Sequence, residues 1–65
     1  KFEIAIIEVK PNAGPSALGQ VQNYVKLYRR DVNPEARPQA VLVTDRIRPD
    51  MDFLAQDAGV ILIVV

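Results

Sequence analysis

The stretch IIEVK near the start of the chain holds two side chains suited to phosphate and metal chemistry, Glu8 and Lys10. Residues two apart on a strand point to the same face, so this carboxylate and this ammonium group are expected to lie side by side. Carboxylate oxygen is a ligand that Mg²⁺ accepts, and a lysine stabilises negative charge developing at phosphorus. The pair therefore indicates either a structural ion pair at a strand end or part of a metal-dependent phosphodiester site.

A helix expected after this strand brings further polar groups to the same place. Turn-forming residues 11–15 separate the two elements, and Ser16 is expected to cap a helix that runs to about Asp31. The N-terminus of this helix points to the carboxyl edge of a parallel sheet and offers N–H groups to an anion. Gln20 lies on its flank, one turn before Tyr24. Together with the carboxylate and the lysine, these groups could hold a divalent metal ion and a phosphodiester.

The rest of the chain predicts two more strands and a second helix. We expect a strand at residues 39–44, a short helix with Pro49 in its first turn and Gly59 at its end, and a strand at residues 60–65. The order β-α-β-α-β implies a parallel sheet. All three strands are apolar on both faces, so we expect helices on both faces of the sheet. The Ile-rich first strand is not expected to lie at an edge.

Composition narrows the classes of protein. A chain of 65 residues is one small domain, and 49% hydrophobic residues are typical of a folded one. Neither cysteine nor histidine is present, which excludes disulfides, zinc–thiolate sites and imidazole catalysis. The chain has eight basic and eight acidic residues, so its formal net charge is zero and gives no indication of nucleic-acid binding. No signal peptide or membrane-spanning segment is visible, so we expect a cytoplasmic protein without a membrane partner.

The motif-bearing residues resemble the C-terminal half of a PD-(D/E)XK nuclease core, found in restriction endonucleases, RecB-type nucleases and mismatch endonucleases. The family's E-x-K matches Glu8-Val9-Lys10. The Q-x-x-x-Y helix pattern of its RecB-like members matches Gln20 and Tyr24, and an Ala-Gly pair precedes the helix here as in the mismatch-endonuclease branch. The resemblance covers essentially the whole chain. It implies an α/β fold, the β-α-β-α-β portion of a three-layer α/β/α core with a mixed, largely parallel sheet.

The resemblance also implies roles for individual residues. Glu8 would bind Mg²⁺ or Mn²⁺, Lys10 would position or polarise the attacking water, and Gln20 would orient the site. The substrate would be DNA, cleaved endonucleolytically, and a homodimer is one expected form of the protein. The implied substrate-binding residues are Ser16, Gln20, Tyr24 and Lys26.

The chain departs from the family at the second metal ligand. That aspartate belongs to the strand before E-x-K, upstream of Lys1, and Glu3 cannot replace it because it points to the face opposite Glu8. We therefore expect residues 1–65 to be a single partial nuclease-like domain of a longer protein. An antiparallel strand beside residues 2–9 would supply the aspartate, and the isolated chain would be inactive. The alternative is a non-catalytic α/β module that serves assembly or nucleic-acid binding.

Several of these residues also have a structural interpretation. Ser16 suits a helix cap, and Tyr24 suits the core. Asp45 suits a turn, with second-acid chemistry as the alternative. Gly19 costs a helix about 1 kcal/mol relative to alanine, which points to the close approach of a strand or of DNA backbone, and packing is the favoured interpretation. Lys26 belongs to a basic helix surface, with Arg29 and Arg30, that is either solvated or meets phosphates.

Overall fold

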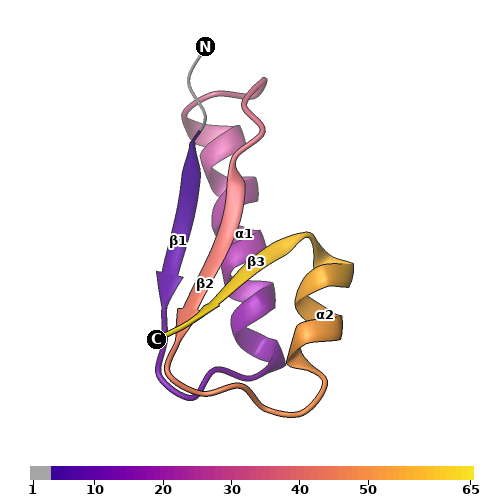
Figure 1. The fold of residues 1–65 in the computed structure, drawn as a ribbon. Helices are drawn as coiled ribbons and strands as arrows, with labels where there is room; N and C mark the ends of the chain where they lie inside the picture. Colours follow the sequence, from indigo (N-terminus) through magenta and orange to yellow (C-terminus); the bar gives the residue numbers. More distant parts are fainter. Residues whose placement is uncertain (1–3) are drawn as a thin grey trace.

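The computed structural model describes residues 4–65 as a three-stranded sheet with two helices (Figure 1). Along the chain these are β1 (Ala5–Val9), α1 (Pro15–Asp31), β2 (Gln39–Thr44), α2 (Met51–Ala58) and β3 (Val60–Val64). All three strands are parallel and lie in the order β1-β2-β3. The predicted α/β class and the β-α-β-α-β order are confirmed. In this part of the chain neither helix is both long and apolar enough to cross a membrane.

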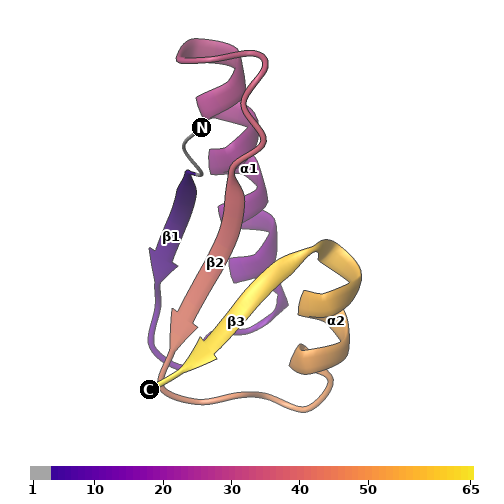
Figure 2. The same cartoon turned by 45° about the horizontal axis from the view of Figure 1, so that its top comes forward.

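Both helices lie on the same face of the sheet (Figures 1 and 2). When strands are neighbours in chain order, each right-handed crossover carries its helix to the same side. The expectation of helices on both faces is therefore wrong for residues 4–65. The apolar pattern of the strands shows that both faces favour burial, but it does not show which element covers each face.

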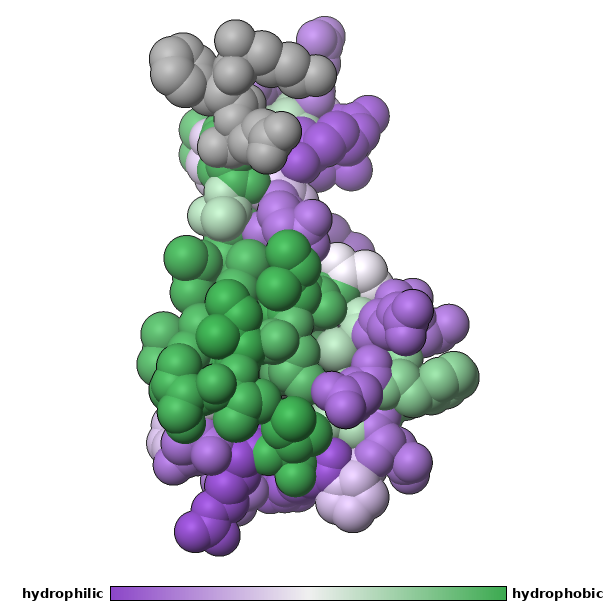
Figure 3. Space-filling model, viewed as in Figure 1, coloured by the Kyte–Doolittle hydropathy of each residue, from purple (hydrophilic) through white to green (hydrophobic). Residues whose placement is uncertain are grey.

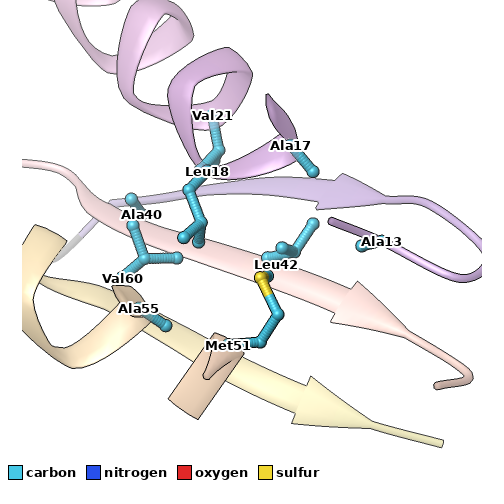
Figure 4. Packing of buried hydrophobic residues seen from close by; sticks show 9 residues of the cluster. All are labelled: Ala13, Ala17, Leu18, Val21, Ala40, Leu42, Met51, Ala55 and Val60. Atoms are coloured by element: carbon cyan, nitrogen blue, oxygen red, sulfur yellow. The ribbon is translucent and has the colours of Figure 1, made fainter. Parts of the chain in front are cut away.

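The core lies between the two helices and the sheet. At its centre, the fully buried Leu42 of β2 meets Val21 from α1 and Met51 from α2 (Figure 4). Burial of a side chain of this size contributes roughly 1.5–3 kcal/mol. The complete cluster is Ala13, Ala17, Leu18, Val21, Ala40, Leu42, Met51, Ala55 and Val60.

The other face of the sheet, here called the open face, carries no helix of the described chain. Strand residues alternate between the two faces, and the parallel register aligns them in rows such as Ile7-Val41-Ile61. Val41 is buried, yet it is not part of the core cluster, because its neighbours on the open face cover it. The open face consists of Ala5, Ile7, Val9, Gln39, Val41, Val43, Ile61, Ile63 and Val65, of which Gln39 is polar.

The start of α1 differs from the prediction. Gly14, in an extended conformation, is the N-cap, and its carbonyl accepts a hydrogen bond from the N–H of Ala17 at 3.0 Å. Pro15 takes the first helical position, for which its fixed φ is suited. Ser16 is thus the second helical residue and makes no capping hydrogen bond, so its prediction as the cap is wrong. The predicted end at Asp31 is confirmed.

The second helix also starts later than predicted. It begins at Met51, so Pro49 precedes it rather than lying in its first turn. Asp50 is the N-cap and adopts a left-handed conformation with φ of 71°. Gly59 ends the helix as predicted, with φ of 74° and its N–H bonded to the carbonyls of Ala55 and Gln56. Glycine suits this position because it has no Cβ.

Candidate active site

The three strands end at one side of the sheet, the carboxyl edge, where both strand-to-helix loops lie (bottom of Figure 1). Hydrogen bonds tie these loops together. The N–H of Ala13 donates to Thr44 Oγ1 at 3.0 Å, and Thr44 Oγ1 donates to the Arg46 carbonyl at 3.2 Å. The N–H of Asn12 donates to Asp45 Oδ1 at 2.8 Å. Asp45 therefore holds the loop between β1 and α1, which agrees with its structural interpretation.

Glu8 and Lys10 lie at the carboxyl edge of β1, on the face that the helices cover. Both side chains are half-buried. Ile7, which precedes Glu8, and Val9, which lies between Glu8 and Lys10, are exposed on the open face. Glu8 is level with the core residue Leu42 of β2. Within residues 4–65 the single salt bridge joins two residues of α1, so no ion pair forms between Glu8 and Lys10. The structural ion pair considered above is absent, and the carboxylate has no cationic partner in the described chain.

Strand β1 lies at an edge of the described sheet, with β2 as its one strand neighbour. This differs from the expectation that the Ile-rich first strand is internal. The antiparallel strand predicted beside residues 2–9 stays a prediction. Glu3, rejected above as a replacement ligand, lies outside the described residues.

Gln20 and Tyr24 lie on the flank of α1 that faces away from α2. The side chain of Gln22 donates to the Ala58 carbonyl of α2 at 3.2 Å, which fixes the flank of α1 turned to the second helix. At 100° per residue, Gln20 is about 200° from Gln22 and thus on the side of β1. Both residues are exposed. The side chain of Tyr24 is 43% exposed, so the structural interpretation that placed it in the core is wrong. No hydrogen bond of residues 4–65 joins Gln20 to Glu8.

The other implied substrate-binding residues, Ser16 and Lys26, are exposed along α1. Ser16 lies at the helix start, next to the carboxyl edge. Lys26 is about 15 Å farther along the helix, given 1.5 Å per residue. Of the basic residues near it, Arg29 donates to the Pro34 carbonyl and Arg30 pairs with Asp31. The hydrogen bond with Asp31 raises the pKa of Arg30.

The described residues do not form a complete metal centre. No three acidic side chains of residues 4–65 lie close enough together to hold a metal ion. Glu8 is one suitable ligand, while Asp45 is engaged by the loop. A shallow pocket of about 150 Å³ lies at the carboxyl edge, but its lining residues include Lys10 and not Glu8. They are Val9, Lys10, Pro11, Val43, Thr44, Asp45 and Val65.

The structure adds one cation that the sequence interpretation missed, Arg48 in the loop between β2 and α2. Its Nη1 lies 2.9 Å from the position that a Cβ on Gly14 would occupy, so the guanidinium packs against the N-cap of α1. Gly14 makes room for this contact because it has no side chain. The two arginines of DRIRPD after the second strand were an available signal for a cation at the carboxyl edge, because the loop that follows a parallel strand begins there, although they do not indicate the contact with Gly14.

Comparison with known proteins gives no independent information about the site. No family model, no curated protein and no solved structure matches this chain. The groups gathered at the carboxyl edge are Glu8, which has no salt bridge within residues 4–65, the neighbouring Lys10, and Arg48 over the start of α1.

Proposed function

We propose that this chain is part of the core of a Mg²⁺-dependent DNA nuclease of the PD-(D/E)XK type and contributes the E-x-K half of its active site. The observation that carries the proposal is the placement of Glu8 and Lys10. They share one face of β1 at the carboxyl edge, and neither is used in a salt bridge within residues 4–65. The carboxyl edge is where ligands of open α/β sheets usually bind.

In this proposal Glu8 is one of at least two carboxylate ligands. A half-buried carboxylate without a cationic partner is costly to the fold, and a bound cation would offset that cost. Mg²⁺ is held by one or two carboxylates together with waters and phosphate oxygens. When bound, it would activate water and polarise the scissile phosphate. The second carboxylate would come from outside residues 4–65.

Lys10 and Arg48 would supply positive charge to the substrate. Lys10 would position or polarise the attacking water and stabilise charge on the phosphate. Arg48 lies against the N-cap of α1, where the partial positive charge of the helix end adds to its own. Gln20 and Ser16, exposed near the start of α1, would contact the DNA or orient the site.

The test is metal-dependent DNA cleavage by the protein that contains this chain. Glu8→Gln removes a metal ligand, and Lys10→Ala removes a charge stabiliser, so each variant should lose about 10²-fold or more in rate. Both substitutions lie at a half-buried strand end, so the circular dichroism spectrum should stay unchanged. The matched controls are Glu35→Gln and Arg37→Ala, exposed residues between α1 and β2 at the opposite end of the sheet.

Loss of cleavage in the two edge variants with full activity in the two controls is the expected result. Cleavage at wild-type rates by Glu8→Gln or Lys10→Ala would contradict a catalytic role. The lack of an acidic cluster in residues 4–65 would then favour a non-catalytic module that serves assembly or nucleic-acid binding.

A further inference from the structure

The loop that follows Lys10 is attached to the end of β2 at three successive residues. The N–H of Lys10 donates to the Val43 carbonyl at 2.9 Å. The next two residues, Thr44 and Asp45, accept hydrogen bonds of 3.0 Å and 2.8 Å from N–H groups of the loop after Lys10. In Figure 3, polar side chains gather at this edge, below the apolar open face. The backbone before and after Lys10 is therefore held by hydrogen bonds to one short stretch of chain.

The hydrogen bond to Asp45 holds an uncommon backbone conformation. Asp45 Oδ1 accepts from the N–H of Asn12, whose φ of 48° lies in the left-handed region. Asparagine adopts this conformation more readily than most residues, because its short polar side chain can hydrogen-bond locally. Backbone of this kind persists where neighbouring groups hold it, and it is frequent at functional sites. The Asp45 carboxylate therefore fixes the turn that lies two residues after Lys10.

The hydrogen bonds of Thr44 and Asp45 differ in what they contribute to the fold. Ala13 and Thr44 are both buried, so the N–H of Ala13 has no water to replace the hydroxyl. Asn12 and Asp45 are exposed, so water can accept from the Asn12 N–H if the carboxylate is removed. The bond to Asp45 is thus dispensable for the core, and its effect is confined to the conformation of the loop beside Lys10.

We infer that Asp45 is a positioning residue of the proposed nuclease site, because its carboxylate fixes the loop that directs the Lys10 side chain. Lys10 and Asp45 line the same shallow pocket, yet no salt bridge joins them within residues 4–65. Asp45 therefore acts on Lys10 through the backbone of the loop. The inference rests on the proposed function, in which Lys10 acts on the attacking water or the phosphate. Displacing such a group by about 1 Å can lower the rate about 100-fold.

The test is Mg²⁺-dependent DNA cleavage by the protein that contains this chain. Asp45→Ala removes the acceptor and should lower kcat about tenfold or more, while KM for DNA stays within about twofold. Asp45→Asn keeps an oxygen that accepts from the same N–H and should retain at least about half of kcat. The matched controls are Asp57→Ala and Asp57→Asn, which should cleave like the wild type, because Asp57 is an exposed carboxylate near the end of α2.

A double-mutant cycle separates positioning of Lys10 from a general structural role. If Asp45 acts through Lys10, Asp45→Ala should cause no further loss of the residual activity in the Lys10→Ala background. Losses that add would overturn the inference. An Asp45→Asn variant that needs a higher Mg²⁺ concentration for cleavage would also overturn it, because Asp45 would then be a metal ligand.

The same measurements distinguish failure of this inference from failure of the proposed function. Cleavage at the wild-type rate by Lys10→Ala contradicts the proposed function and the inference with it. Loss of cleavage in Lys10→Ala with full kcat in Asp45→Ala contradicts the positioning role alone.

A measurement on the wild-type protein covers the case in which Asp45→Ala does not fold. Because its N–H is bonded to Asp45, the amide of Asn12 should exchange with solvent at least about tenfold more slowly than in an unstructured peptide. An Asn12 amide that exchanges at the rate of an unstructured peptide would overturn the inference, whatever the cleavage rates.

Discussion

Thr44 shows how one buried hydroxyl holds the carboxyl edge together. It is 2% exposed, accepts from the N–H of Ala13 and donates to the carbonyl of Arg46. This one side chain thus hydrogen-bonds to both loops that frame the candidate site. A valine has nearly the same shape but offers no hydrogen bond to the buried N–H.

Replacing Thr44 should accordingly destabilise the chain and loosen the site. Thr44→Val leaves a buried N–H without a partner, which should lower the free energy of unfolding by about 1–3 kcal/mol. Thr44→Ser keeps the hydroxyl and should cost less. Chemical denaturation of both variants beside the wild type measures the difference, and a Thr44→Val variant as stable as the wild type would show that the hydroxyl does not matter here.

Single residues also show where sequence reasoning about the site succeeded and where it failed. The shared face of Glu8 and Lys10 follows from the two-residue period of a strand, which tertiary structure does not change. The position of Arg48 against Gly14 depends on how two loops far apart in the chain meet, so no local pattern contains it. Tyr24 was misjudged because an apolar stripe predicts the buried side of a helix but not how far the sheet extends beneath it.

At the scale of elements, two of the three glycines, Gly19 and Gly59, have opposite roles. Gly19 lies in the middle of α1, and a Cβ there would meet no atom of the described chain within 4 Å. The close packing predicted for it is therefore not present. Gly59 is different, since its φ of 74° is a conformation that other residues adopt only with strain.

Substituting alanine at these positions should change stability in opposite directions. Gly19→Ala should raise the free energy of unfolding by about 0.5–1 kcal/mol, because alanine has the higher helix propensity. Gly59→Ala should lower it by about 1–2 kcal/mol, because alanine is strained at positive φ. Thermal unfolding of the two variants beside the wild type measures both. A Gly19→Ala variant that is more stable yet binds DNA less well would indicate that DNA approaches this side of α1.

The helices and strands were largely predictable from the sequence, but the face of the sheet that each helix covers was not. Gln39–Thr44 was predicted with the correct bounds because it is a short β-branched run between clear turn signals. The helix starts were missed, since Gly14 and Asp50 are caps whose backbone conformation, not their side chains, ends the preceding loop. The layer arrangement was wrong because an apolar strand face indicates burial without naming what covers it.

At the scale of the whole molecule, residues 4–65 place Glu8 at the edge but bring no three acidic side chains together, and Asp45 is engaged by a loop. Isothermal titration of the chain with Mn²⁺ should therefore show only weak binding, without saturation at micromolar concentrations. Glu8→Gln should reduce the remaining signal, whereas Glu35→Gln should not. Stoichiometric binding in the micromolar range would mean that the chain completes the site alone, and Asp45 would be the first candidate for the second ligand.

The position of β1 beside a single neighbour should appear in the timing of amide hydrogen exchange. The Lys10 N–H donates to the Val43 carbonyl of β2, and along a parallel ladder every second N–H of an edge strand does the same. The amides of Glu8 and Lys10 should thus exchange slowly, while those of Ile7 and Val9 point away from β2 and should exchange much faster. A strand bound along this edge in a larger protein would slow the exchange of the Ile7 and Val9 amides selectively. The exchange rates of these two amides therefore report whether β1 has gained a second neighbouring strand.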